Sequence, residues 1–178
     1  VERLRDIEAE DLLGRAPVEL DEAGIAQTLG GKTVMITGAG GSIGSELCRQ
    51  VARFRPARLV LYEQSEFNLY TIEQELNESF PGLPLARLIG DVKDLPHLRQ
   101  AFAAWRPQVV FHAAAYKHVP LMEFENAAAA LRNNTLGTYH AALAAAEAGA
   151  ERFVLISTDK AVNPTNVMGA SKGAAEMV

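Results

Sequence analysis

The chain has 178 residues, 48% of them hydrophobic, and a formal net charge of −5. This length and apolar content predict a single domain with one sizeable core. The acidic balance excludes the basic surface that nucleic-acid binding requires, and the single cysteine, Cys48, excludes an internal disulfide framework.

The expected location of the protein is the cytoplasm. A lone cysteine fits a reducing compartment, and we expect Cys48 to be a core residue rather than a reactive thiol. No apolar run approaches the length of a membrane span, and no secretory signal precedes the first predicted strand. Since the chain begins with Val1, a membrane-embedded region ahead of it in a longer parent stays open.

Residues 1–30 form a charged lead-in, for which we predict a short helix and irregular chain. Leu12, Leu13 and Ile25 are its main apolar residues, and the pair Gly30-Gly31 separates it from the first predicted strand. The sequence therefore predicts a lead-in over 1–30 and one α/β domain over 31–178.

A glycine-rich turn follows the first predicted strand, Val34–Ile36, and opens a helix expected over 45–54. Gly38 allows the tight turn, Gly41 lets a pyrophosphate approach the backbone, and Gly44 lets the helix pack on the strand. Unpaired N–H groups at the helix start and the helix dipole favour anions. The turn therefore predicts a dinucleotide site rather than a merely structural turn. Its expected cofactor-binding residues are Gly38, Gly41, Ser42, Ile43 and Gly44.

The second predicted strand, Leu59–Tyr62, is followed by an acidic residue, Glu63. A carboxylate there accepts a hydrogen bond from a ribose 2′-hydroxyl and repels a 2′-phosphate, so we expect NAD as the cofactor in preference to NADP. A helix is predicted over Ser65–Ser79, where apolar residues recur at helical spacing.

The remaining predicted elements alternate between strand and helix. We predict strands over Leu85–Ile89, Val109–Phe111 and Arg152–Ser157, a helix over Leu95–Trp105, and a long alanine-rich helix over Glu125–Ala148. This alternation predicts a doubly wound parallel sheet of the Rossmann type, of which the first five strands and their helices are present.

Polar residues cluster just past the fifth predicted strand. Ser157–Lys160 supplies two hydroxyls, an acid and a lysine, and Met168–Lys172 supplies a second lysine. Because ligands bind beyond the carboxyl ends of the strands in open α/β sheets, we expect the chemistry to take place here.

These motifs together resemble the extended short-chain dehydrogenase/reductase family. Within it they are most similar to the nucleotide-sugar 4,6-dehydratases of bacterial polysaccharide synthesis, often described as capsular polysaccharide biosynthesis proteins. The resemblance covers nearly everything from Lys32 onward. The matching segments are residues 38–44, Glu63 with 65–70, and residues 90–94, 112–120, 134–138 and 157–172. Segment 11–15 also resembles the stretch that follows a membrane-embedded region in long members.

The resemblance implies further contacts with the cofactor. The Asp91 carboxylate would accept from the exocyclic amine of adenine while Val92 packs on the ring. Lys172 would bind the nicotinamide ribose, and Asn134 would support the active site, although a buried asparagine satisfied by backbone is the alternative. A wall of small residues would lie beside the cofactor, unless these residues simply pack; they are Ala113, Ala114 and Ala115.

The resemblance also implies a reaction. A hydride passes from the fourth carbon of the sugar to nicotinamide, a base removes the proton on the fifth carbon, an acid helps the sixth-carbon hydroxyl leave as water, and the hydride returns there. We assign the acid to Asp159, the base to Lys160, and a hydrogen bond to the fourth-carbon oxygen to Thr158. A lysine base needs a lowered pKa, from burial or from nearby positive charge. The alternative is a surface Asp-Lys pair at a strand end.

One residue departs from the wider family, in which Tyr-x-x-x-Lys is usual. Met168 stands at the tyrosine position, and a thioether takes no proton from a sugar hydroxyl. Some polysaccharide dehydratases of this type carry methionine there, so the change points to that subgroup. The base for the oxidation stays open among Lys160, Asp159 through water, and Thr158 as a relay.

The four histidines lack the spacing of a metal site, so no metal is expected. We interpret them as structural or surface residues, with His118 as the best exception because the resemblance places its loop beside the sugar. The four are His97, His112, His118 and His140.

The resembling enzymes continue into a smaller domain that grips the nucleotide and sugar. We therefore expect a C-terminal substrate domain to be absent from this chain, which alone would be inactive. The expected function of a homo-oligomeric parent is NAD-dependent dehydration of a UDP-sugar, UDP-N-acetylglucosamine, to a 4-keto-6-deoxy sugar. A nucleotide-sugar epimerase is a rival function, but such an enzyme normally needs a tyrosine at the position that Met168 occupies here. A non-catalytic dinucleotide-binding module is another rival function. It would not need the predicted catalytic residues Asp159, Lys160 and Lys172, which are present.

Overall fold

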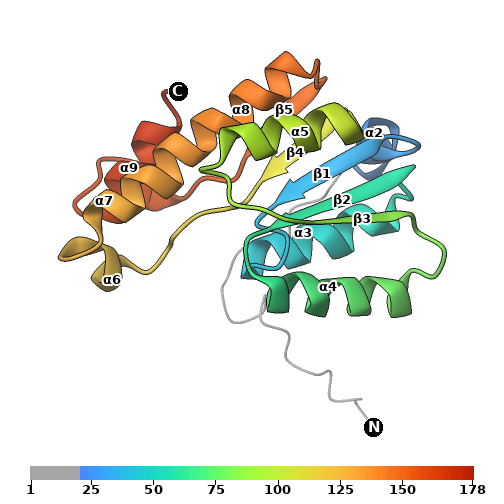
Figure 1. Ribbon diagram of the computed structural model, residues 1–178, viewed down its shortest axis with the longest axis horizontal. Coiled ribbons are helices and arrows are strands. Elements are labelled where there is room, and N and C mark those ends of the chain that lie inside the picture. Colours follow the sequence, from blue (N-terminus) through green and yellow to red (C-terminus); the bar gives the residue numbers. More distant parts are fainter. Residues whose placement is uncertain (1–20) are drawn as a thin grey trace, which may run out of the picture.

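Five parallel strands form the centre of the structure, a computed structural model that describes residues 21–178 (Figure 1). Their order across the sheet is β3-β2-β1-β4-β5. This is the order of a doubly wound Rossmann sheet, and it confirms the predicted fold class. The strands are β1 (Thr33–Thr37), β2 (Arg58–Glu63), β3 (Leu85–Ile89), β4 (Val109–His112) and β5 (Arg152–Leu155).

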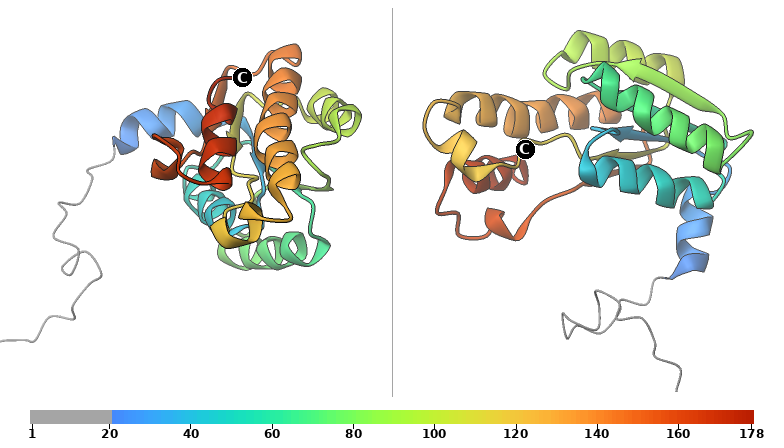
Figure 2. Two further views of the ribbon diagram at one scale, coloured as in Figure 1. Left: turned by 90° about the vertical axis from the view of Figure 1, so that its left-hand side faces the viewer. Right: turned by 90° about the horizontal axis from the view of Figure 1, so that it is seen from below.

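Helices cover both faces of the sheet, because alternate residues of each strand point to opposite sides. Val34 and Ile36 of β1 pack on the side of α2 (Glu22–Leu29), α3 (Ser42–Arg53) and α4 (Glu66–Ser79). Met35, between them, packs on the side of α5 (Leu95–Trp105) and α8 (Gly137–Glu147). Three short helical segments and α9 lie beyond the carboxyl ends of the strands (Figures 1 and 2). They are α6 (Val119–Glu123), α7 (Ala127–Ala130), the 3₁₀ turn η2 (Asp159–Ala161) and α9 (Val167–Ala175).

Side chains fix the positions at which the helices begin. The hydroxyl of Ser65 accepts from the Asn68 N–H at 3.3 Å, and the carboxylate of Asp94 accepts from the His97 N–H at 3.0 Å. Each cap satisfies an N–H group that the helix itself leaves unpaired. Both caps face the carboxyl side of the sheet, so they also fix the loops that line the site described below.

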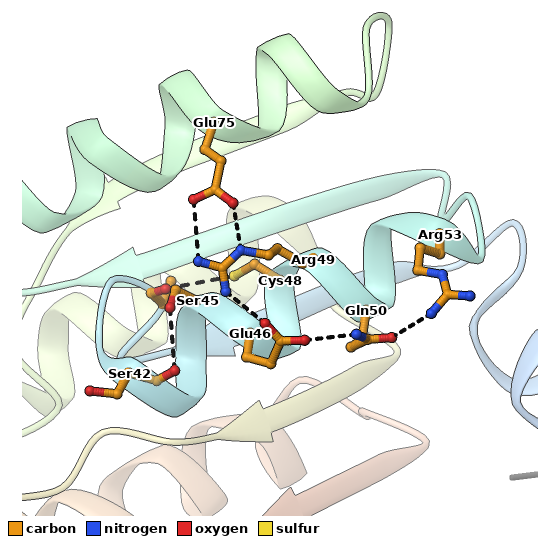
Figure 3. A network of polar contacts seen from close by, with 9 residues as sticks. Ser42, Ser45, Glu46, Cys48, Arg49, Gln50, Arg53 and Glu75 are labelled. Carbon is orange, nitrogen blue, oxygen red and sulfur yellow. Dashed lines mark hydrogen bonds and ion pairs between the residues drawn. The ribbon is translucent and has the colours of Figure 1, made fainter. Parts of the chain in front are cut away.

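A polar network ties α3 to α4 (Figure 3). Arg49 of α3 pairs with Glu75 of α4 and with Glu46 one turn back on its own helix, where Nη1 and Oε2 are 2.7 Å apart. The three side chains are part exposed, so solvent screens the pairs and they add little to stability. The pairs instead hold α3 in place against α4, and α3 is the helix that directly follows the glycine-rich turn.

The predicted long helix over Glu125–Ala148 is wrong in detail. The helical stretch starts at Ala127 and ends at Glu147, and its middle, η1 (Leu131–Leu136), is π-helical. There the Gly137 N–H reaches back five residues to the Arg132 carbonyl. Asn133 and Asn134 are buried in this π-turn, and their side chains bond to other parts of the chain. Single π-turns of this kind are frequent at functional sites.

Two other predicted boundaries differ from the structure. The helix expected over 45–54 begins at Ser42, because extended Gly41 serves as its N-cap and accepts from the Ser45 N–H at 2.8 Å. The strand expected over Arg152–Ser157 ends at Leu155, and Ser157 turns away to donate a hydrogen bond to Glu176.

The predicted lead-in is described only in part. Leu12, Leu13 and segment 11–15 lie outside the described residues, whereas Leu29 of α2 is buried in the first core cluster with Cys48, which is a core residue as expected. None of the helices within residues 21–178 combines the length and apolar character that crossing a membrane requires.

Candidate cofactor and active site

The glycine-rich turn packs directly on the loop that follows β4. Gly38 has φ +68°, and a Cβ built on it would lie 2.8 Å from the Ala114 backbone. A Cβ on Gly44 would lie 1.9 Å from the Gly38 carbonyl oxygen. Any side chain at either position would therefore push the turn off the sheet. The turn leaves the amino end of α3, with Ser42 and Ile43 in its first turn, facing the space above the strands.

A first cavity of about 180 Å³ lies beside this turn. It brings together residues from four separate segments that the sequence assigned to the cofactor. They are Gly38, Gly41, Glu63, Val92, Ala113, Ala114 and Ala115. Asn68, Tyr116 and Asn133 line it as well.

Glu63 connects the glycine-rich turn to α4. One of its oxygens accepts from the Gly40 N–H and the other from the Ser65 N–H, both at 3.0 Å. The residue is only 6% exposed. Since each carboxylate oxygen has two acceptor positions, these two bonds leave acceptor capacity for a ligand hydroxyl.

Asp91 does not line the first cavity, although Val92 does. Its carboxylate accepts from the backbone N–H of Lys93 at 2.9 Å and pairs with Lys93 Nζ at 2.8 Å. Burial would raise the pKa of Asp91, but the hydrogen bonds and charge of Lys93 together lower it below its ordinary value. The charged carboxylate is therefore already held by a neighbour.

A second cavity, of about 390 Å³, lies at the carboxyl ends of β4 and β5. Gly41, Ala113, Ala115 and Tyr116 line both cavities, so the two adjoin, and we refer to them together as the groove. The predicted catalytic residues that line its second part are Thr158, Lys160, Met168 and Lys172, with Ser42 and Ile43 opposite. The groove thus runs from the predicted adenine side to the predicted reaction centre.

Asp159 is absent from the lining of the second cavity. It is exposed, and its carboxylate accepts from the Thr158 hydroxyl at 3.0 Å. The Thr158 hydroxyl also accepts from the Lys160 N–H at 3.4 Å, which starts the short turn η2. Lys160 is exposed as well, so residues 21–178 do not supply the burial expected around a lysine base.

Lys172 and Met168 reach the groove from α9. Lys172 is 4% exposed, and its Nζ donates to the Ile156 carbonyl at 2.6 Å. Burial lowers the pKa of Lys172, against the opposing charge of Glu176. Met168 is buried against Met122 and Ala130. A thioether at this position has no proton to exchange with a substrate.

The sequence reasoning assigned no role to Lys117 or Tyr116. Lys117 Nζ donates to the Ser42 hydroxyl at 2.9 Å across the groove, and the Tyr116 backbone is held by Asn134. Asn134 accepts from the Tyr116 N–H at 2.8 Å and donates to its carbonyl at 3.0 Å and to the Ser171 hydroxyl at 2.9 Å. The sequence feature that could have indicated both residues is the polar segment that directly follows the three alanines after β4.

Within residues 21–178, no three His, Cys, Asp or Glu side chains come together as a metal site would require. His118 is exposed ahead of α6 and lines neither part of the groove. His112 is the one fully buried histidine of the described chain and lies between Thr37 and Thr138.

The polysaccharide biosynthesis protein family matches residues 34–178. The chain belongs to this family. It is 50% identical over its whole length to the capsular polysaccharide biosynthesis protein CapD of Staphylococcus aureus, of which it covers 30%. It is 33% identical to a UDP-N-acetylglucosamine 4,6-dehydratase (inverting) of Campylobacter jejuni, over 82% of this chain and 42% of that enzyme. The resemblance inferred from the motifs is therefore confirmed at the level of the family.

Other relatives carry a different activity in their names. A UDP-glucose 4-epimerase of Rickettsia canadensis is 34% identical over 82% of this chain and 42% of its own length. The chain thus spans less than half the length of these relatives.

Solved structures share the fold. Pen from Bacillus thuringiensis superposes with a TM-score of 0.76 at 30% identity, over 84% of this chain and 46% of that one. The enzyme WbmG of Bordetella bronchiseptica, solved in complex with NAD and UDP, superposes with a TM-score of 0.64 at 25% identity, over 81% of this chain and 48% of that one.

Proposed function

We propose that the chain is the cofactor-binding part of an NAD-dependent UDP-N-acetylglucosamine 4,6-dehydratase of surface polysaccharide synthesis. The observation that carries the proposal is the groove of two adjoining cavities, with the glycine-rich turn and Glu63 in one part and Thr158, Lys160 and Lys172 in the other. A cofactor site and a set of proton-handling groups thus open into the same space.

The residues of the first part fit a dinucleotide. The turn is closed to any Cβ at Gly38 and Gly44. Gly41, the N-cap of α3, makes no side-chain cap bond, so the first N–H groups of α3 are available to a pyrophosphate. Glu63 retains acceptor capacity for a ribose 2′-hydroxyl. Binding of NAD by WbmG, whose fold is the same, supports the choice of cofactor.

The chain's own residues would then divide the work on the sugar. Bound NAD would supply a nicotinamide able to take a hydride from the fourth carbon and return it to the sixth. Thr158 would hydrogen-bond the fourth-carbon oxygen, whose hydroxyl proton would pass to Lys160, to Asp159 through water, or through Thr158 as a relay. Lys160 would remove the fifth-carbon proton, and Asp159 would protonate the departing sixth-carbon hydroxyl. Lys172 holds the nicotinamide ribose with the proton positions of Nζ that Ile156 leaves free. Asp159 must turn from Thr158 toward the groove for its step.

An epimerase remains the second candidate, because a UDP-glucose 4-epimerase is among the relatives. Epimerization at the fourth carbon normally relies on a tyrosine base, and Met168 occupies that position on α9. The buried thioether favours the dehydratase.

Product analysis of the complete protein distinguishes the two. Incubation with UDP-N-acetylglucosamine and NAD, followed by proton NMR of the nucleotide sugar, should show loss of the sixth-carbon hydroxyl and a new methyl doublet. Formation of UDP-N-acetylgalactosamine without a methyl signal would establish the epimerase instead. Binding of NAD with neither product would support a non-catalytic module.

A further inference from the structure

His112 is completely buried at the end of β4, and both of its ring nitrogens are paired. The Thr37 hydroxyl lies 2.7 Å from Nδ1, and the Thr138 hydroxyl lies 3.1 Å from Nε2. Thr37 ends β1 and is in register with His112 across the sheet, whereas Thr138 is the second residue of α8, just after the π-turn. The imidazole therefore joins three elements that no continuous stretch of sequence connects.

The hydrogen bonds determine the tautomer. The Thr138 hydroxyl donates its one proton to the Asn134 carbonyl, 2.6 Å away, so it can only accept from His112. Nε2 must therefore carry the proton, and Nδ1 accepts from the Thr37 hydroxyl. Burial, with a further contribution from the charge of Lys172, lowers the pKa of His112 to about 3, which keeps this ring neutral at physiological pH.

Each end of this chain of hydrogen bonds leads to a wall of the groove. At one end, Thr37 directly precedes Gly38, whose backbone touches that of Ala114. At the other, Asn134 holds the Tyr116 backbone and the hydroxyl of Ser171, the neighbour of Lys172 on α9. The ring is thus linked by hydrogen bonds to residues that line both parts of the groove.

We propose that His112 is a positioning residue: as the neutral Nε2–H tautomer it fixes the distance between the glycine-rich turn and the π-turn, and so aligns the cofactor part of the groove with the catalytic part. An apolar side chain of similar volume, such as leucine, would occupy the site without directional bonds, so packing alone does not require an imidazole here. A fully satisfied buried polar chain holds one arrangement where an apolar contact tolerates several. The functional part of this inference rests on the proposed function.

The tautomer is tested directly by long-range ¹H–¹⁵N correlation NMR of the ¹⁵N-labelled protein. The His112 signals should show the neutral Nε2–H pattern at every pH from 5 to 8. An Nδ1–H pattern, or titration of His112 between these pH values, would overturn the assignment.

The positioning role is tested by removing one hydroxyl at a time. Thr37→Val, which removes one buried hydrogen bond, should weaken NAD binding by about tenfold with little change in kcat. Thr138→Val, which removes the bonds to both His112 and the Asn134 carbonyl, should lower kcat by at least about tenfold with little change in the Kd of NAD. Thr138→Ser should restore kcat. The matched control is Thr71→Val, because the Thr71 hydroxyl also donates to the carbonyl four residues back, at 2.8 Å, but on the exposed side of α4.

A readout independent of the cofactor separates this inference from the proposed function. Thr138→Val should shift the amide signals of Tyr116 and Ser171, and Thr71→Val should not. If these shifts appear and the wild-type protein fails to bind NAD, the proposed function is wrong and the positioning role stands. If Thr37→Val and Thr138→Val lower only the melting temperature and leave shifts, Kd and kcat as in Thr71→Val, His112 is a core residue alone.

Discussion

The Lys117 ammonium donates a hydrogen bond to the Ser42 hydroxyl, with 2.9 Å between Nζ and Oγ, and so spans the groove at the amino end of α3. Lys117 comes from the loop after β4 and Ser42 from the first turn of α3. An exposed lysine held at a helix N-terminus adds a full positive charge to backbone groups that already favour anions.

Lys117→Gln should therefore weaken NAD binding about tenfold, as expected for loss of one charge-assisted hydrogen bond. The salt dependence of the Kd should fall with it. Isothermal titration with NAD at two salt concentrations measures both quantities. Ser42→Ala, which frees Lys117 without removing its charge, serves as the control and should change the Kd less. An unchanged Kd in Lys117→Gln would place the pyrophosphate away from this lysine.

Glu63 should make the protein prefer NAD to NADP. Its buried carboxylate accepts from Gly40 and Ser65 and would repel a 2′-phosphate, so the Kd of NADP should be at least about tenfold higher. Arg53 and Arg58 lie close in sequence and would reduce the difference if either approached the phosphate. Titration with both nucleotides gives the ratio, and equal or tighter binding of NADP would contradict the role of Glu63.

Glu63→Gln provides a second measurement at the same site. An amide has an NH₂ group at one end, which would face the N–H of Gly40 or Ser65 and leave a buried donor unpaired, at a cost of about 1–3 kcal/mol. The free energy of unfolding should therefore fall together with NAD affinity. A variant that loses affinity with unchanged stability would show that the two backbone contacts do not hold the turn.

The elements that the sequence predicted well are those determined locally. The alternation of strands and helices predicted a doubly wound parallel sheet, and the spacing of Gly38, Gly41 and Gly44 predicted the turn, because hydrophobic period and backbone permissiveness act over a few residues. The π-turn could not be predicted in this way. It is accompanied by bonds from Asn134 to Tyr116 and Ser171, which lie 18 and 37 residues away.

The same distinction applies to the site. The sequence predicted that Asp159 and Lys160 lie at the carboxyl end of the sheet. It could not predict their exposure, because that depends on what packs against η2. The sequence analysis interpreted His112 as a structural or surface residue but could not identify its hydrogen-bond partners, because Thr37 and Thr138 come from other elements. The contact between Lys117 and Ser42 likewise joins two loops 75 residues apart.

His112 should make stability depend on acid pH. Its pKa in the folded protein is about 3, against about 6.5 in an unfolded chain, because of burial and then the charge of Lys172. Between these values the unfolded state binds more protons, so the free energy of unfolding falls as the pH drops from 6.5 toward 3. Urea titrations of the wild type and His112→Phe at several pH values should show a smaller fall in the variant. Parallel curves would mean that His112 is not the titrating group.

Met168→Tyr should not raise turnover of the complete protein more than about twofold, because the site is arranged for a different base. Met168 is 3% exposed and packs against Met122 and Ala130, so the larger ring should also cost about 1–3 kcal/mol of stability. Steady-state kinetics and thermal unfolding measure the two effects. A large gain in rate would show an ordinary tyrosine-dependent site in which the methionine is a defect.

Asp159→Asn and Lys160→Ala test the assignment of acid and base in the complete protein. Both should retain NAD binding, because neither residue lines the first part of the groove. Dehydration should nevertheless fall by about two to four powers of ten, the usual contribution of general acid-base groups. The double variant should lose less than the product of the single losses, since residues that act as a unit are not additive. If Lys160 is the base, Lys160→Ala should also slow exchange of the fifth-carbon proton with deuterated solvent. Exchange at the wild-type rate alongside lost water elimination would assign Lys160 an electrostatic role and transfer the base to another residue.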